Sequence, residues 1–202
     1  AEQFNVGLKY TRNFEKSPFM RMLDVSVDAY YNKITDKIIA YPKGQQFRWT
    51  MLNLGEVEIK GVDAGLNALF TLGKLEVTTK IQYTYQKAID ITDPADTYYR
   101  DQIPYIPWHS GSAIVALSWG TWSLGYSFIY VGERYNQQEN IIYNHTQPWY
   151  TSDMTLMKEI RWGKARLRFT AEVNNLFDQD YDVILNYPMP MRNYKFGLAV
   201  EL

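Results

Sequence analysis

The sequence predicts an all-β fold, an antiparallel meander of about nine strands, from two observations. Large apolar residues alternate with polar or small residues along most of the 202-residue chain, and a period of two is typical of strands with two unlike faces. The connections between these alternating segments are short and long in turn. A chain that folds back at each connection places all the short turns at one end of its sheet and all the long loops at the other.

The alternation defines the individual strands. Its most complete example is the last segment, in which every even position from Tyr194 to Leu202 is large and apolar, while the odd positions are charged or small. The even residues are Tyr194, Phe196, Leu198, Val200 and Leu202. The nine segments are 4–10, 23–31, 62–70, 75–85, 113–119, 122–130, 154–162, 165–173 and 194–202.

One segment changes parity near its start. Val57 and Ile59 are odd, whereas the apolar series that begins at Val62 is even, and the change falls at Gly61. An inserted residue at a glycine is a common way for a strand to shift its register. We therefore predict a β-bulge or a sharp bend at Gly61.

The connections differ in length and composition. Three of them, 72–74, 119–121 and 162–164, have a central glycine and predict tight hairpins. A somewhat longer turn with a proline is expected at 12–21. The long connections are 34–50, 87–110, 132–151 and 175–190. Long irregular loops are uncommon in compact domains unless they have a function, so a binding site is expected among them.

Composition narrows the classes of function. A net charge of -1 without a basic run argues against nucleic-acid binding. The absence of cysteine excludes a disulfide framework and a cysteine-based metal site, and His109 and His145 are the only histidines. The carboxylates of "DITDPADTYY" (90–99) lack the glycine and closing glutamate of an EF-hand loop, so they are interpreted as a solvated loop. We expect no enzyme activity, no cofactor and no metal site.

Aromatic residues make up 16% of the chain, although the mean hydropathy is -0.37. No apolar run approaches the roughly 20 residues of a membrane helix, but a membrane β-barrel spreads its apolar signal over alternate residues. Trp119, Trp122 and Trp162 flank the short turns. Tryptophan favours the membrane–water interface, so these three predict a periplasmic aromatic girdle. A soluble sandwich with aromatic hairpin ends remains the alternative.

The two strand faces have different expected surroundings. The apolar face is predicted to contact lipid, which makes Lys158 an exception: either its ammonium group extends toward the periplasmic surface, or the register there differs. The other face is expected to line a wet lumen. Its charged residues are Asp24, Asp28, Lys80, Arg166, Arg168, Glu172, Lys195 and Glu201.

Several motifs resemble one family, the TonB-dependent outer-membrane receptors. The tail has Asn-Leu-Phe-Asp at 175–178, an aromatic-proline pair at 187–188 and Arg-Asn-Tyr at 192–194. The stretch "IKGVDAGLNALF" (59–70) is similar to the family's Gly-Val-Glu strand, with Asp63 in place of glutamate. "SVDAYYNKITDKI" (26–38) and "IPYIPWHSGSAIVAL" (103–117) resemble the preceding strand and a Pro-x-x-Pro loop. The resemblance extends over nearly the whole chain.

This resemblance implies a 22-stranded transmembrane β-barrel with an N-terminal plug, of which residues 1–202 are the C-terminal portion. A complete single-chain barrel has an even number of strands, so nine strands indicate a fragment cut in an outer loop, without the plug and the TonB-contacting segment. The resemblance also implies that the alternating last strand is a signal for the barrel-assembly machinery. Leu202 departs from the aromatic residue usual at that terminus.

Candidate ligand-binding residues come from the long loop 132–151, which is rich in tyrosine, asparagine, glutamine and tryptophan. Amphipathic rings and amides suit a polar organic ligand. The candidates are Arg134, Tyr135, Tyr143, His145, Trp149 and Tyr150. Ordinary folding of the loop is the alternative explanation for the same residues.

The expected function is active import of a scarce nutrient across the bacterial outer membrane. Ferric siderophore is the cargo that the resemblance implies first, with a vitamin or a glycan as other possibilities. The expected partners are outer-membrane lipid, the TonB complex, the barrel-assembly machinery and the small-molecule nutrient, with no nucleic acid. Two alternatives are a small porin or autotransporter barrel end, and a soluble secreted β-sandwich that binds a ligand.

Overall fold

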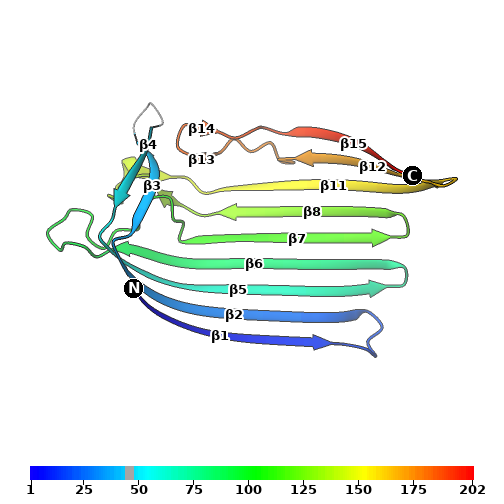
Figure 1. The fold of residues 1–202 in the computed structure, drawn as a ribbon, viewed down its shortest axis with the longest axis horizontal. Helices are drawn as coiled ribbons and strands as arrows, with labels where there is room; N and C mark the ends of the chain where they lie inside the picture. Colours follow the sequence, from blue (N-terminus) through cyan, green and yellow to red (C-terminus); the bar gives the residue numbers. More distant parts are fainter. Residues whose placement is uncertain (44–47) are drawn as a thin grey trace.

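A computed structural model describes residues 1–43 and 48–202. Nine long strands form one antiparallel sheet in which each strand pairs with the next long strand along the chain (Figure 1). They are β1 (Glu2–Asn13), β2 (Met20–Thr35), β5 (Glu56–Leu72), β6 (Leu75–Asp90), β7 (His109–Trp119), β8 (Trp122–Val131), β11 (Trp149–Trp162), β12 (Ala165–Asn174) and β15 (Asn193–Glu201). The predicted nine-stranded antiparallel meander is confirmed.

The two ends of the sheet differ, as Figure 1 shows. One end, the turn end, has short hairpins in which Gly73, Gly120 and Gly163 have φ between +58° and +63°, a conformation that glycine adopts without strain. The other end, the loop end, carries the short elements β3 (Ile38–Lys43), β4 (Arg48–Asn53), β9 (Arg134–Tyr135), η1 (Ile142–Asn144), β10 (His145–Thr146), β13 (Asp182–Ile184) and β14 (Tyr187–Pro188). Within the described ranges, no helix is long and apolar enough to cross a membrane.

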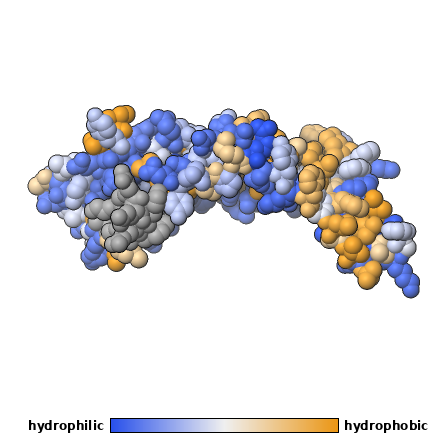
Figure 2. Space-filling view, turned by 90° about the horizontal axis from the view of Figure 1, so that it is seen from above, coloured by the Kyte–Doolittle hydropathy of each residue, from blue (hydrophilic) through white to orange (hydrophobic). Residues whose placement is uncertain are grey.

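The sheet has two unlike faces. The outer face carries the alternating apolar residues, of which Leu8 is 76% exposed and Phe196 is 82% exposed. The inner face is polar: Asp28 and Asp63, for example, lie opposite each other on β2 and β5. Figure 2 shows hydrophobic residues gathered toward the turn end and hydrophilic residues toward the loop end. An apolar surface of this extent marks a contact with something other than water.

An aromatic row crosses the outer face toward the loop end. Cross-strand pairing places Phe4 opposite Tyr31, Tyr85 opposite His109, and Tyr130 opposite Tyr150. The members lie 7 to 12 residues from the turn ends of their strands, close to the roughly 9–11 residues that a tilted strand needs to cross a bilayer. We call this set the outer aromatic row: Phe4, Tyr31, Tyr85, His109, Tyr130, Tyr150 and Tyr194.

The three predicted girdle tryptophans lie at the turn end. Trp119 and Trp122 are directly opposite each other on β7 and β8, and Trp162 ends β11. All three are exposed, at 60%, 43% and 78% respectively. Their positions are those that a girdle at the second membrane surface requires, and contact with a membrane stays a prediction.

Lys158 keeps the predicted register on the outer face, opposite Trp122 and Phe169. Its ammonium group extends toward the turn end, where it donates to the Thr121 hydroxyl and lies 4.5 Å from the centre of the Trp122 ring. Of the two outcomes expected from the sequence, an extended ammonium group or a different register, the structure has the extended ammonium group. A lysine that lies along an apolar surface in this way keeps its charge at the interface.

The predicted bulge at Gly61 is wrong. Tyr30, Gly61 and Gln86 pair in a regular ladder, with no register shift at this point on β5. Glycine is needed for another reason: an added Cβ would lie 2.7 Å from the Tyr85 carbonyl oxygen and would meet the Tyr30 ring. The ring of Tyr30 covers this position, so the sequence marked a close approach of a side chain rather than an inserted residue.

The change in parity reflects a change in which face is buried. Val57 and Ile59 lie on the inner face, at 0% and 7% exposure, and pack with Ala88 from β6 and with Leu54 and Ile103 from the loops. Within the described residues this cluster forms the hydrophobic core, and it lies at the loop end. Loops cover the inner face there, so apolar residues turn inward although the strand continues unbroken.

Candidate functional site

Long connections meet at the loop end and are tied to one another by hydrogen bonds. The backbone N–H of Tyr105 donates to the Tyr135 carbonyl oxygen at 2.7 Å. The backbone N–H of Asn140 donates to the Asp101 carboxylate at 2.8 Å. The Thr97 hydroxyl donates to Glu139 at 2.6 Å. Loops 91–108 and 132–148 therefore form one folded cap at this end of the sheet.

A cavity of about 270 Å³ lies beneath this cap. Its walls come from five separate parts of the chain, and most of the lining side chains are apolar or aromatic. The lining residues are Ala40, Tyr105, Val131, Arg134, Trp149, Val183 and Ile184. Val131 and Trp149 are paired on β8 and β11, and both belong to the inner face. The cavity therefore opens on the polar side of the sheet.

Arg134 is the charged residue that lines the cavity, and only 2% of its surface is exposed. One of its amino groups, Nη2, donates to the carbonyl oxygens of Asp182 and Val183 at 2.8 and 2.9 Å. These bonds tie loop 132–148 to β13. The other amino group, Nη1, is buried with no partner among the described residues. Burial lowers the pKa of the guanidinium from its usual value, although arginine remains protonated.

Trp149 also lines the cavity and carries a polar N–H group. Its indole stacks on Tyr181, with ring centres 4.6 Å apart, and its Nε1 hydrogen is buried without a described partner. Burial also raises the pKa of the Tyr181 hydroxyl, with Asp153 adding to the shift. A buried N–H group without an acceptor typically costs about 1–3 kcal/mol, so an acceptor placed beside it would bind favourably.

Two of the residues that line the cavity carry buried polar atoms without a hydrogen-bond partner. Within the described part of the chain, three buried side-chain polar atoms lack a hydrogen-bond partner: Arg134 Nη1, Trp149 Nε1 and Thr146 Oγ1. Thr146 pairs with Arg134 in the β9–β10 ladder. Native proteins pair nearly all of their buried polar groups. The cavity therefore suits a ligand with oxygen acceptors, preferably anionic ones, attached to an apolar or aromatic body.

The structure separates the six candidate residues predicted from the sequence. Arg134 and Trp149 line the cavity. Tyr135 and His145 do not line the cavity, because Tyr135 follows Arg134 directly in β9 and its side chain points to the opposite face. The rings of Tyr135 and His145 pack edge to face, with centres 5.8 Å apart, and the His145 Nε2 atom lies 3.2 Å from a Glu133 carboxylate oxygen.

The other two candidates lie away from the cavity. Tyr143 lies in η1 and is 89% exposed. Tyr150 lies on the outer face, where its ring is 6.0 Å from that of Phe128. Because Tyr150 follows Trp149 directly in β11, the two side chains point to opposite faces. Tyr150 is a member of the outer aromatic row.

Sequence reasoning missed the other residues that line the cavity. Tyr105 comes from the loop before β7, Ala40 from β3, and Val183 and Ile184 from β13. A weak signal was present, since apolar residues at 183–185 interrupt an otherwise polar loop. Nothing in the sequence pattern tells which loop they contact.

The loop carboxylates have structural partners. The Asp90 carboxylate, on a residue only 4% exposed, accepts from the Thr92 N–H at 2.8 Å, and Asp93 accepts from the Ala95 N–H at 2.9 Å. Asp90 is therefore buried, unlike the solvated loop position that was expected. Within the described residues, no group of three His, Cys, Asp or Glu side chains could hold a metal ion.

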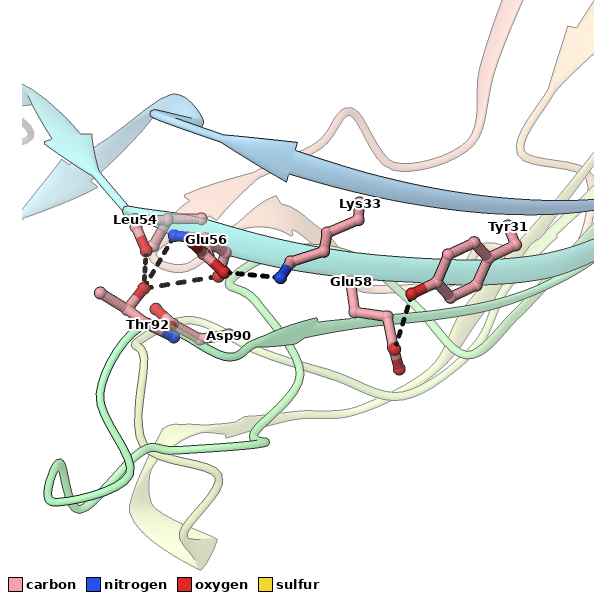
Figure 3. A network of polar contacts seen from close by, with 7 residues as sticks. All are labelled: Tyr31, Lys33, Leu54, Glu56, Glu58, Asp90 and Thr92. Atoms are coloured by element: carbon pink, nitrogen blue, oxygen red, sulfur yellow. Dashed lines mark hydrogen bonds and ion pairs between the residues drawn. The ribbon is translucent and has the colours of Figure 1, made fainter. Parts of the chain in front are cut away.

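Thr92 fastens loop 91–108 to the connection before β5 (Figure 3). Its hydroxyl donates to the Leu54 carbonyl oxygen and accepts from the Glu56 N–H. Figure 3 also shows Lys33 paired with Glu56 and the Tyr31 hydroxyl bonded to Glu58. These contacts fix the base of the cap.

The fold and the site together define a class of protein. An antiparallel meander with an apolar outer belt, aromatic residues at both margins of that belt, a polar inner face and a cap of long loops is typical of the wall of a transmembrane β-barrel. Over residues 1–176 the chain matches the TonB dependent receptor-like, beta-barrel family, and it belongs to that family. The match does not favour the porin, autotransporter and sandwich alternatives.

Solved receptors share this fold. The ferric-catecholate import receptor Fiu from E. coli K12 has 18% identity and a TM-score of 0.67, covering 98% of this chain and 27% of Fiu. The ferric yersiniabactin uptake receptor FyuA from Yersinia pestis has 16% identity and a TM-score of 0.64, covering 98% and 29%. The copper transporter OprC has 17% identity and a TM-score of 0.57, covering 98% and 31%. The chain thus spans less than a third of these proteins.

Proposed function

We propose that this chain forms part of the barrel wall of an outer-membrane active transporter that imports a scarce nutrient, with a ferric siderophore as its cargo. The cargo binds at the loop end on the inner face, and the TonB complex supplies the energy for import through a part of the receptor outside residues 1–202. The assignment of the cargo is supported by structural similarity to Fiu, a ferric-catecholate import receptor, and to FyuA, a ferric yersiniabactin uptake receptor.

One observation carries the proposed binding role. The cavity under the loop cap is lined by Arg134 and Trp149, whose Nη1 and Nε1 donors are buried without a partner among the described residues, and by side chains that are otherwise mostly apolar. Siderophores present anionic oxygens on organic frameworks, and such oxygens are strong acceptors for a guanidinium group and for an indole N–H. The cavity is small, so it would hold one arm of a larger complex.

The test uses the full-length receptor with Trp149→Phe, which keeps the ring but removes the donor. Loss of one hydrogen bond is expected to weaken binding by about 0.5–1.5 kcal/mol, roughly two- to tenfold in Kd. Trp162→Phe, at the turn end, is the matched control and should bind normally. Binding and radiolabelled-iron uptake would be measured with ferric catecholate, hydroxamate and carboxylate siderophores, and with copper as a separate arm.

Arg134→Lys gives a second, independent variant. Lysine keeps the charge but lacks the planar group from which arginine donates in two directions. It should therefore lose either the hydrogen bonds to the β13 carbonyl oxygens or the hydrogen bond to the ligand. Normal uptake by both variants, with normal amounts of receptor in the membrane, would refute a role for this cavity. Uptake of copper alone would replace the siderophore assignment.

A further inference from the structure

A second pocket, of about 360 Å³, adjoins the binding cavity at the loop end. It lies against the inner face of β5 and β6, where Ile59 and Ala88 line it. Ala40 and Tyr105 line both this pocket and the cavity that contains Arg134. The two spaces therefore meet at these two shared residues, and a single ligand can occupy both. We call the second space the aliphatic pocket.

The walls of the aliphatic pocket are mainly saturated hydrocarbon. Lys37 and Gln86 contribute to its lining, but five isoleucines from β3, β5 and the loop before β7 dominate it: Ile38, Ile39, Ile59, Ile103 and Ile106. Ile59 and Ile103 belong to the buried core, whereas Ile38 is 63% exposed. Water in such a space finds few hydrogen-bond partners, so an apolar group binds there in preference to water.

A buried glutamine holds one wall of the aliphatic pocket in place. Gln102 is 0% exposed, and its Oε1 atom accepts from the Ala88 N–H at 2.8 Å. Its Nε2 group donates to the carbonyl oxygens of Gln86 and Ile106 at 3.2 and 3.3 Å. The Ile103 N–H also donates to the Ala88 carbonyl oxygen, at 2.9 Å. Segment 102–106 is thus fastened to the loop end of β6, and a wall fixed in this way lowers the cost of ordering on binding.

The two adjoining spaces offer different chemistry. The cavity presents the unpaired donors of Arg134 and Trp149, whereas the aliphatic pocket presents apolar area. An aromatic group gains most where it can stack on other rings, and Tyr105, at the border with the cavity, is the one aromatic residue among those described that line the pocket. A saturated chain gains from burial alone. The pair of spaces therefore matches a molecule with an anionic head and a hydrocarbon chain.

We propose that the aliphatic pocket binds the hydrocarbon chain of an acylated siderophore whose anionic head occupies the cavity beside Arg134. The inference rests on the proposed function, because the role of the cavity as the site of the head comes from it. It narrows the cargo from siderophores in general to amphiphilic ones.

The experiment measures binding to the full-length receptor, held in amphipol, of ferric catecholate and ferric hydroxamate siderophores. Each head is prepared without a chain and with linear saturated acyl chains of increasing length. Each methylene that enters the pocket should tighten Kd by about fourfold, which corresponds to about 0.8 kcal/mol. The gain should stop at the length that fills the pocket.

Two variants place an amide in the aliphatic pocket without touching the cavity. Ile106→Gln puts it among the isoleucines and should weaken binding of the long-chain probes by roughly tenfold. Ile38→Gln changes an exposed residue, so folding should be normal, and it should weaken the same probes by about two- to fourfold. Ile142→Gln, at a 79% exposed position in η1 outside both spaces, is the matched control. All three variants should bind the chain-free probes like the wild type.

The possible results separate this inference from the proposed function. Binding of the siderophores with no dependence on chain length would overturn the inference and leave the proposed function intact. A chain-length gain that is unchanged in Ile38→Gln would place the chain elsewhere, for example in the amphipol, and would also overturn it. Failure of every probe to bind, with or without a chain, would overturn the siderophore assignment and this inference together.

Discussion

On strand β5, the turn half and the loop half place their aliphatic residues on opposite faces of the sheet. Near the turns, residues such as Leu66 and Leu198 lie on the outer face, and Leu198 is 61% exposed. Near the loops, Val57 and Ile59 of the same strand β5 lie on the inner face and are buried. The ladder between these halves is unbroken. A single strand can therefore serve two surroundings by changing which of its faces is apolar.

The proposed membrane location explains the difference. In a bilayer the outer face meets hydrocarbon and the lumen is wet, so apolar residues belong outside. Beyond the bilayer the outer face meets water, and the loops that fold over the inner face offer an apolar interior. The three predictions that follow test this account of the two halves, and each uses the full-length receptor.

The largest effect is expected in the core of the loop half. Ile59→Ala removes a nearly buried side chain from the cluster of Leu54, Val57, Ala88 and Ile103, and such truncations cost about 2–5 kcal/mol. Ile81→Ala, on the outer face at 43% exposure, is the matched change and should cost less. Denaturant unfolding of the two variants would show this. A larger loss for Ile81→Ala would contradict a core at the loop end.

The next effect concerns the outer face of the turn half. Leu66 lies in the middle of the proposed lipid belt, opposite Val25 and Ile81. Leu66→Arg should destabilise the barrel in lipid vesicles by about 2–4 kcal/mol, the usual cost at the midplane. Gln82→Arg, on the inner face beside Gly65, should be nearly neutral. Folding yields and urea midpoints in vesicles measure both, and a neutral Leu66→Arg would show that this face does not contact lipid.

The smallest of the three effects is expected at the boundary between the halves. Gly61→Ala forces a Cβ against the Tyr85 carbonyl oxygen and the Tyr30 ring, and overpacking of this kind costs about 1–3 kcal/mol. Gly125→Ala is the control, because its added Cβ would have only ordinary contacts, 4.0 Å from Thr155. A lower urea midpoint of unfolding for Gly61→Ala alone would support close packing of Gly61 against Tyr30 and Tyr85. Equal midpoints for the two variants would argue against it.

Local sequence pattern was sufficient to predict the nine long strands and the tight turns, but not the short strands within the long connections. Side chains alternate between faces in any strand, so the residues that share a face follow from parity. The same rule places Tyr150 with Met154 and Leu156 on the outer face, and parity could therefore have excluded it from the ligand candidates.

Parity could not tell what lies over each face. The inward position of Val57 and Ile59 depends on loops that cover them, and the sequence gives no direct sign of that cover. The cavity was less predictable still, because Tyr105, Arg134 and Val183 are brought together by contacts between loops far apart in the chain. Arg134 and Trp149 were predicted as ligand residues from their chemistry. That the two residues line the same cavity could not be predicted.

The unpaired donors of Arg134 and Trp149 have a consequence for selectivity. The protein has already removed these groups from water, so a molecule that lacks acceptors leaves that cost uncompensated, whereas one that supplies them recovers it. Sites built on buried hydrogen-bonding groups reject analogues without the matching group far more strongly than apolar pockets reject an extra methylene. The cavity is thus suited to choosing among molecules of similar size by their oxygen atoms rather than by their bulk.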